Sequence, residues 1–433
     1  MESTFDSCFQ LAVTQNQIDN DLYRLYNVKK GLRNEDGTGV RIGLTRIADV
    51  VGYEYKDGVK TPCEGKLIYR GYEIRSLVEN KAHMGFEETC FLLLFGWLPS
   101  AEQLKRFHEL LTSAYELPHR FMEANILPTH SSHLMNRLQQ MVLALFDYDQ
   151  DPEDTSPQNT LRQGIELLAR MPALITSLFQ VKQHHYDRQS LTIHYPQEEL
   201  SIAENILYLL REDKKFTELE ARALDAALIL HADHGSNNST FTNHVVSSTG
   251  TDTYSAMAAS LCALKGPRHG GANIKVVEMM ADLKSHVGDP TDEGQVREYL
   301  QAVLDKKALD GLGLIYGMGH AVYSLSDPRA EVLRGFVRDI SKEKGLNREM
   351  DMYLTVEKVA KELLTARTGK PVAVNVDFYS GFLYDMLDLP KELYTPLFAI
   401  ARMAGWSAHR MEELGENSKI IRPACKCIEK RRP

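Results

Sequence analysis

The chain has 433 residues, which is enough for two domains and a large buried core. Its composition, 43% hydrophobic and 25% charged, is that of an ordinary globular protein. The net charge of −9 argues against a general binder of nucleic acids or membrane surfaces, although local arginines can still bind small anions. The six cysteines are scattered, and Cys425 and Cys427 have no second pair to complete a zinc site, so we expect free thiols.

The first ten residues, MESTFDSCFQ, lack the basic-then-apolar order of a targeting segment. The longest apolar run, residues 90–98, is too short to cross a bilayer. We therefore expect a cytoplasmic protein with small-molecule substrates and with neither a membrane nor a nucleic acid as partner.

Helical periodicity dominates the chain, and strand patterns are few. Apolar residues recur at helical spacing in five segments, namely 86–95, 104–111, 161–179, 218–230 and 253–264. Further helices are predicted to begin near residues 274, 328 and 378. The predicted strands are residues 39–43, 65–69 and 372–376. The sequence therefore predicts a mostly α-helical protein.

The segment GPRHGGAN (residues 266–273) contains one histidine among small residues, just before a helical pattern. The glycines after His269 allow a backbone or a ligand to approach closely. A histidine at the start of a helix lies near the positive end of the helix dipole, which favours the neutral ring. A neutral imidazole can still donate a hydrogen bond to a carbonyl oxygen.

The segment HADHGSNNST (residues 231–240) follows the helix predicted at 218–230. His231 and His234 are three residues apart, so they could share a helix face and bind a metal with Asp233 or His244. Two other interpretations are a capped pair of core histidines and an anion-binding helix end. No second carboxylate cluster lies at metal-ligand spacing, and we predict no metal site.

Two short segments follow near residue 320. In YGMGHAVY (316–323), Gly317 and Gly319 permit a tight loop that presents His320, although such a loop is often only a turn. In SDPR (326–329), Asp327 is predicted to cap a helix that begins at Pro328. Arg329 would then project from the first turn, where a solvated surface arginine is the simpler interpretation.

The segment NVD ends at Asp377, where a short apolar strand is predicted to give way to an aromatic-rich helix. A helix N-cap is the simpler role for this carboxylate, and it would lower the pKa. Burial against Phe378 and Tyr379 would raise the pKa instead. The sequence leaves both possibilities open.

Together and in this order, these segments resemble the citrate synthase family. The resemblance includes GPRHGGAN, YGMGHAV followed by DPR, NVD, and HADH with 35 positions between His234 and His269. It extends to GKLIYRGYEI and GWLP near the beginning, AIARMAGWSAH with Arg402, and IIRP with Arg422. It implies an all-α, two-domain fold, with a large domain of residues 1–270 and 382–433 and a small domain of residues 271–381.

The resemblance implies that the methyl carbon of acetyl-CoA joins the ketone of oxaloacetate, after which the citryl thioester is hydrolysed. Asp377 would remove the methyl proton, His269 would donate to the thioester oxygen, and His320 would donate to the ketone of oxaloacetate. Four side chains would bind the two carboxylates of oxaloacetate: His234, Arg329, Arg402 and Arg422. Acetyl-CoA is then a co-substrate, and no permanently bound cofactor is implied.

In this family the last arginine reaches across from the partner subunit, which implies a homodimer in which Arg422 completes the neighbouring site. Gly317 and Gly319 are candidates for CoA binding. Ser324 stands where many members carry a Lys or Arg that helps to hold the CoA phosphates, and Arg33 is our candidate substitute.

Three alternatives remain open at this point. The nearest is a 2-methylcitrate synthase that uses propionyl-CoA, because one methyl group changes binding by only about 1–3 kcal/mol. The second is a metal-dependent hydrolase built on His231, Asp233, His234 and His244. The third is a helical protein without catalysis, which the presence of all three proposed catalytic residues disfavours.

Overall fold

The computed structural model describes residues 4–79, 84–415 and 419–429. Contacts divide the chain into a terminal unit (residues 1–44 and 422–433) and a main unit (residues 45–421). The terminal unit contains helices α1 (Thr4–Gln15) and α2 (Asn20–Leu25) and the 3₁₀ turn η1 (Lys30–Leu32). Among its described residues only Thr38 is buried, so they form no hydrophobic core. The strand predicted at residues 39–43 is wrong, because Gly39 forms only an isolated bridge with Arg33.

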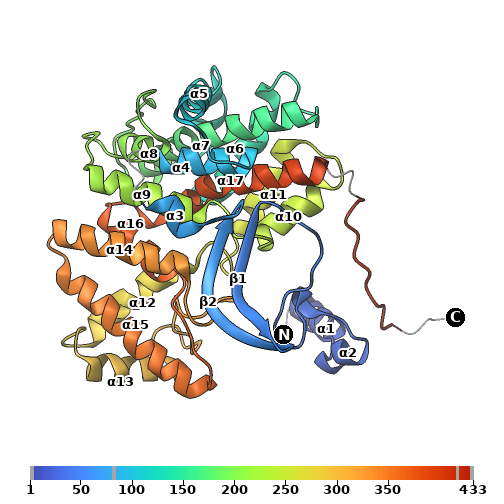
Figure 1. Ribbon diagram of the computed structural model, residues 1–433, viewed down its shortest axis with the longest axis vertical. Coiled ribbons are helices and arrows are strands. Elements are labelled where there is room, and N and C mark those ends of the chain that lie inside the picture. The colour runs from blue at the N-terminus through green and yellow to red at the C-terminus, as the bar shows by residue number, and fades with distance from the viewer. Residues whose placement is uncertain (1–3, 80–83, 416–418, 430–433) are drawn as a thin grey trace. The chain divides into compact units, whose positions relative to one another are not determined.

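Helices make up most of the main unit (Figure 1). In chain order they are α3 (Ile74–Val78), α4 (Gly85–Phe95), α5 (Ala101–Thr112), η2 (Met122–Ile126), α6 (Leu134–Ala144), η3 (Leu145–Tyr148), α7 (Pro157–Tyr186), α8 (Ile202–Leu210), α9 (Glu218–His231), α10 (Asn238–Ser247), α11 (Thr253–Leu264), α12 (Ala272–His286), α13 (Glu293–Leu304), α14 (Pro328–Glu343), α15 (Asn347–Thr368), α16 (Val376–Met386), η4 (Lys391–Leu393) and α17 (Tyr394–Gly415). The prediction of a mostly helical fold is confirmed.

All five helices predicted from periodicity are present, and α7 differs most from its predicted bounds. Ser156 caps α7 through the Asn159 N–H, and Pro157 occupies its first position, where no intrahelical donor is needed. By length and composition α7 could cross a membrane. However, 89% of its most apolar stretch is buried inside the protein, as is usual for a core helix.

A three-stranded antiparallel sheet of β1 (Ala48–Lys56), β2 (Val59–Tyr69) and β3 (Tyr72–Glu73) is the main departure from an all-helical fold. β1 and β2 form a long hairpin, drawn as curved blue arrows in Figure 1, with a register shift between Val51 and Tyr53. The strand predicted at 65–69 is the end of β2, whereas β1 was not predicted. The strand predicted at 372–376 is wrong, since Val374 forms only an isolated bridge with Met318.

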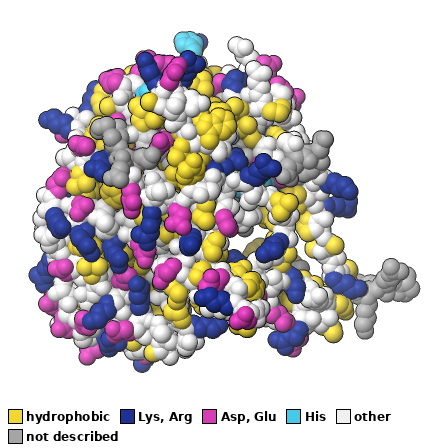
Figure 2. Space-filling view, viewed as in Figure 1, with side chains coloured by type: hydrophobic (Ala, Val, Ile, Leu, Met, Phe, Trp, Pro, Cys, Tyr) yellow, Lys and Arg dark blue, Asp and Glu magenta, His cyan; other side chains and the backbone are white. Residues whose placement is uncertain are grey.

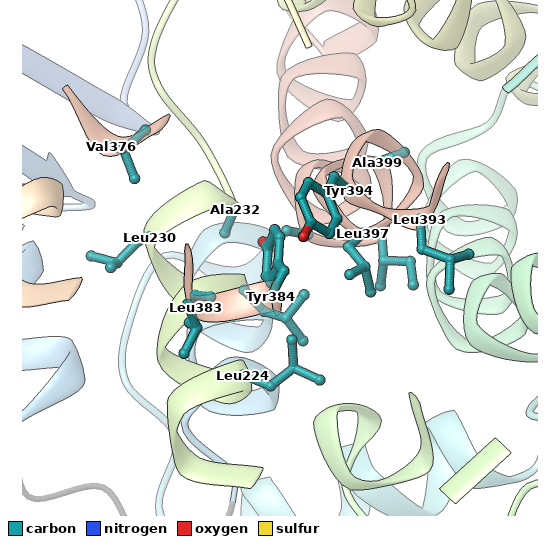
Figure 3. Packing of buried hydrophobic residues seen from close by; sticks show 14 of the residues in the cluster. Leu224, Leu230, Ala232, Val376, Leu383, Tyr384, Leu393, Tyr394, Leu397 and Ala399 are labelled. Carbon is teal, nitrogen blue, oxygen red and sulfur yellow. The ribbon is translucent and has the colours of Figure 1, made fainter. Parts of the chain in front are cut away.

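A buried cluster joins α9, α16 and α17 in the centre of the main unit (Figure 3). Leu224 and Leu230 of α9 lie near Leu383 and Tyr384 of α16, and the Tyr384 ring lies 5.1 Å from that of Tyr394, which begins α17. Segments of these helices carry or adjoin three candidate site residues: His234 follows α9, Asp377 lies in the first turn of α16, and Arg402 lies within α17. Close packing of the helices therefore fixes the positions of those segments.

The predicted division into large and small domains stays a prediction, because the main unit holds residues from both. Helix α14 of the predicted small domain packs on α15 and α16, but also on α9, α3 and β2.

On the face shown in Figure 2, Lys and Arg side chains are intermixed with Asp and Glu side chains.

Two carboxyl groups are buried together between α4 and α9. Glu87 is 0% exposed, its Oε1 accepts a hydrogen bond from the Ile202 N–H (2.6 Å), and its Oε2 has no partner among the described residues. Asp225 accepts from the Phe86 N–H (3.0 Å). Burial raises the pKa of Glu87 to about 7 and raises the pKa of Asp225 as well. Near neutral pH this pair therefore retains a proton.

This buried pair predicts that the protein is less stable at neutral pH than at mildly acidic pH. The folded state holds the Glu87 proton more tightly than the unfolded chain, so the free energy of unfolding falls as pH rises from about 4.5 to 7. Glu87→Gln should flatten that fall by on the order of 1–3 kcal/mol, measured by denaturant unfolding at several pH values. The exposed control Glu116→Gln should follow the wild type. An unchanged slope in Glu87→Gln would contradict the assignment.

Candidate active site

The turn after α9 is held by hydrogen bonds from β2. The hydroxyl of buried Tyr69 accepts from the Asp233 N–H (3.0 Å) and donates to the Asp233 carbonyl (2.7 Å). The Asp233 carboxylate accepts from the Gly235 N–H (2.8 Å). His231, the last residue of α9, donates from Nδ1 to the Ala227 carbonyl (2.7 Å). These bonds fix the backbone on both sides of His234.

The His234 ring lies beside the loop that carries His320. Its centroid is 5.1 Å from that of His320 and 5.6 Å from that of Tyr323, both edge to face. Its Nε2 is buried and has no partner among the described residues. Burial, followed by the charge of Arg329, lowers the pKa of His234 well below its usual value. The neutral ring therefore offers a free polar atom inside the protein.

The Gly317–Gly319 loop pairs with the segment before α16. The Gly319 N–H donates to the Ala373 carbonyl (2.7 Å), and the Asn375 N–H donates to the Gly317 carbonyl (2.9 Å). Both glycines have positive φ (76° and 79°), and a Cβ at Gly317 would lie 2.8 Å from Phe378. The loop is therefore a specific structure that depends on glycine.

The His320 ring has a defined tautomer. Its Nδ1 accepts from the Val322 N–H (3.0 Å) and the Tyr323 N–H (3.3 Å), and the ring stacks on Tyr323 at 4.8 Å. Because backbone N–H groups only donate, these bonds assign the proton of the neutral ring to Nε2. The donor atom of the His320 ring is therefore Nε2.

Two arginines lie deep in the main unit. Arg329 is 4% exposed and pairs with Asp327 through Nε (3.0 Å) and Nη2 (2.7 Å), so the interpretation of a surface arginine is wrong. Asp327 also caps α14, as predicted. Arg402 of α17 is 1% exposed, donates from Nε to the His231 carbonyl (2.8 Å), and leaves Nη1 without a partner among the described residues.

His269 lies in the turn between α11 and α12. Its Nε2 lies 3.4 Å from the Ser239 N–H, which donates to it, and 2.9 Å from the Ser239 hydroxyl. Because a peptide N–H can only donate, the contact with the Ser239 N–H assigns the ring proton to Nδ1, the reverse of His320, whereas the hydroxyl contact fits either tautomer. Burial and the charge of Arg402 lower the pKa of His269 to about 4, so the ring is neutral near pH 7. Burial is the larger of these two causes.

Asp377 lies in the first turn of α16. The N-cap is Asn375, which accepts from the Asp377 N–H (3.0 Å), so the interpretation of Asp377 as the cap is wrong. Burial raises the pKa of Asp377 to about 6; the charge of Arg329 opposes this effect and that of Asp327 adds to it. A carboxyl with this pKa is mostly ionised at pH 7 and still a moderately strong base.

The structure brings six predicted residues into one region. His234, His320 and Arg329 meet around Tyr323, and His269 and Arg402 meet around Phe398. Arg329 and Arg402 both lower the pKa of His234, and Arg329 acts on Asp377, which links the groups. The sequence did not single out Phe398 or Ser239 for this region. Ser239 lies in the segment 231–240 that the sequence analysis singled out, and Phe398 immediately precedes AIARMAGWSAH, but neither residue type alone indicates a site.

Two of the remaining predicted residues belong to the terminal unit and a third, Ser324, belongs to the main unit. Arg33 and Arg422 are exposed residues of the terminal unit, where Arg33 donates to the Gly37 carbonyl (3.2 Å), so their roles stay predictions. Ser324 is half-buried, three residues before Asp327. All six cysteines are free thiols.

The proposed metal ligands do not converge. His244 contacts Glu413 (2.8 Å) and His409 (3.2 Å), whereas His231 and Asp233 make the bonds described above. Across residues 4–79, 84–415 and 419–429, no three His, Cys, Asp or Glu side chains form a metal-binding group. The structure therefore gives no support to a metal-dependent hydrolase.

Comparison with known proteins shows what this chain is similar to. A family model described as "Citrate synthase, C-terminal domain" matches residues 36–424. The solved citrate synthase of Pyrobaculum aerophilum has a TM-score of 0.76 and 30% identity, over 91% of each chain. That of Thermoplasma acidophilum, solved as a ternary complex with carboxymethyl coenzyme A and oxaloacetate, has a TM-score of 0.73 and 26% identity, over 93% of this chain and 98% of that one.

Proteins named citrate synthase and proteins named 2-methylcitrate synthase both match the chain. The citrate synthase of Acidithiobacillus ferridurans is 36% identical over 366 residues, 83% of this chain and 88% of that protein. The 2-methylcitrate synthase 1 of Corynebacterium glutamicum is 33% identical over 405 residues, 92% and 94% of the two. The fold and these matches define the class of protein as a mostly helical enzyme of the acyltransferase type. The chain belongs to the citrate synthase family.

The Tyr69 hydroxyl predicts a measurable contribution to stability. Tyr69→Phe would leave the buried N–H and carbonyl of Asp233 without this partner, which should lower the free energy of unfolding by about 1–3 kcal/mol. Chemical denaturation of both proteins tests this prediction, with Tyr72→Phe as the control because Tyr72 is 39% exposed. Equal loss in the two variants would contradict a specific role for the Tyr69 hydroxyl.

Proposed function

We propose that the protein condenses acetyl-CoA with oxaloacetate and hydrolyses the resulting citryl thioester to citrate and CoA. One observation carries this proposal: two neutral imidazoles of opposite tautomer, a carboxyl with a raised pKa and two buried guanidinium groups occupy one region. The similarity to a citrate synthase solved with oxaloacetate and carboxymethyl coenzyme A supports the same reaction.

Asp377, His269 and His320 have complementary roles in the proposed reaction. The Asp377 carboxylate takes a proton from the methyl group of acetyl-CoA, while Nδ1–H of His269 donates to the thioester oxygen as the enol or enolate forms. The methyl carbon then attacks the ketone of oxaloacetate. The oxygen of that ketone receives the electron pair of the broken π bond and a proton from Nε2–H of His320. Water finally cleaves the thioester, which releases CoA.

The two carboxylates of oxaloacetate would bind to guanidinium groups, which match carboxylates with paired hydrogen bonds. The Nη1 of Arg402 and the Nε2 of His234 are buried polar atoms without a partner among the described residues, and Arg329 lies with His234 around Tyr323. We further propose a cytoplasmic homodimer in which Arg422 completes the neighbouring site, with Gly317, Gly319 and Arg33 contributing to CoA binding.

The reaction is tested by following thiol release from acetyl-CoA and, separately, from propionyl-CoA, each with and without oxaloacetate. We expect release that requires oxaloacetate and is faster with acetyl-CoA. Faster release from propionyl-CoA would support a 2-methylcitrate synthase instead, the name of one of the relatives. Thiol release without oxaloacetate, or none at all, would contradict the proposed condensation.

The base assignment predicts the effect of one substitution. Asp377→Asn should keep oxaloacetate affinity but lower kcat by about 10²–10⁴-fold, because the amide cannot accept the methyl proton. Asp351→Asn, at an exposed position on α15, is the matched control and should leave kcat unchanged. Near-normal turnover in Asp377→Asn would contradict the assignment.

The raised pKa of Asp377 also predicts a pH dependence. The base acts as the carboxylate, so kcat/KM should fall about tenfold per pH unit once the pH drops below about 6. The profile is measured with wild-type protein that remains folded throughout. An acidic limb near pH 4, the usual value for an exposed carboxyl, would contradict the role of burial at this residue.

A further inference from the structure

The β1–β2 hairpin contacts three segments that carry candidate site residues, although none of its own residues is a candidate. Gly52 lies against the peptide that joins Val322 to Tyr323, and Gly65 lies against the carbonyl of Ser326. Tyr69 bonds to the backbone of Asp233. The hairpin is therefore next to the segments of His320, Arg329 and His234.

The contact at Gly52 leads directly to His320. A Cβ at Gly52 would lie 2.4 Å from the Val322 carbonyl oxygen, so any side chain there would force this peptide to move. The N–H of the same peptide belongs to Tyr323 and donates to Nδ1 of His320 at 3.3 Å. Gly52 does not have a positive φ, so its backbone conformation does not require glycine. Close approach is the reason for glycine at this position.

The contact at Gly65 leads to Arg329 in the same way. A Cβ at Gly65 would lie 2.2 Å from the Ser326 carbonyl oxygen and 2.8 Å from the Tyr323 ring. The Gly65 N–H donates to the Ser326 hydroxyl (3.1 Å), which also bonds to Glu64. The next residue after Ser326 is Asp327, which holds Arg329 by two hydrogen bonds.

We propose that the β1–β2 hairpin is a positioning element for oxaloacetate, in which Gly52 sets the orientation of His320 and Gly65 sets that of the Asp327–Arg329 pair. This inference rests on the proposed function. Tyr69 at the end of β2 gives the hairpin a fixed reference, because it bonds to the turn that carries His234. The hairpin thereby aligns the side chains of residues 231–234 with those of residues 320–329. The predicted domain boundary separates these two segments.

Gly52→Ala and Gly65→Ala test the proposal, with Gly335→Ala on α14 as the control because a Cβ there meets open space. A misplacement of about 1 Å in a site can cost about 10²-fold in rate, so we expect Gly52→Ala, which forces the Val322 peptide to move, to lower kcat by about tenfold. Gly65→Ala should weaken oxaloacetate binding, measured by calorimetry, by about tenfold. The KM for acetyl-CoA at saturating oxaloacetate should change by no more than about twofold.

A purely structural role for the glycines predicts something different. In that case the alanine substitutions would lower the folded fraction but leave the oxaloacetate dissociation constant and the kcat per folded molecule unchanged. That result would overturn the proposal. Should the alanine variants fail to fold, Ser326→Ala removes the Gly65 hydrogen bond without adding an atom. It should weaken oxaloacetate binding several-fold, and wild-type affinity in Ser326→Ala would overturn the proposal as well.

The same measurements separate this inference from the proposed function. If the wild-type protein binds no oxaloacetate, the proposed function is contradicted, and the role of the hairpin in positioning groups for oxaloacetate is contradicted with it. If the wild-type protein binds oxaloacetate and the glycine variants bind and turn over equally well, only the proposed role of the hairpin is contradicted.

Discussion

Two guanidinium groups buried in a helical core are the constraint on which the rest of the region depends. Burying a cation is costly unless it is paired, yet Arg329 has one carboxylate partner, and Arg402 donates from Nε to the His231 carbonyl. Their charges act on the neighbouring titratable groups. They lower the pKa of His234 and His269 in addition to burial, and Arg329 partly offsets the rise at Asp377. The Nη1 of Arg402 has no partner among the described residues, so the region keeps a guanidinium donor that suits a carboxylate ligand.

Backbone groups then decide what each neutral imidazole can do. Peptide N–H groups occupy Nδ1 of His320 and Nε2 of His269, which leaves the opposite nitrogen of each ring as the donor. The peptides themselves are held by packing, through α10 for Ser239 and through Gly52 of the hairpin for Val322. The directions of the two donors are thus a property of the fold, set before any substrate arrives. Such preorganisation is the general source of electrostatic stabilisation in enzymes.

Much of the fold and the site could be predicted from the sequence. Helices with a clear apolar face, such as α5, were found because their spacing is periodic, and the motifs together with the resemblance to the citrate synthase family identified six residues that do lie together. The predictions that were wrong concern features that depend on tertiary contacts. The segment 372–376 looks like a strand, but only Val374 pairs, with Met318, and β1 was missed because its exposed end is polar. The N-cap of α16 and the burial of Arg329 likewise depend on packing that local sequence does not contain.

The central claim is that the two candidate donor imidazoles are neutral, with opposite tautomers. Nitrogen-15 NMR of histidine-labelled protein tests it most directly, with His269→Gln and His320→Gln used to assign the signals. The account predicts that at pH 7 His269 carries its proton on Nδ1 and His320 on Nε2, and that His269 begins to ionise only as the pH approaches about 4. An imidazolium signal for either residue at pH 7, or the same tautomer for both, would contradict it.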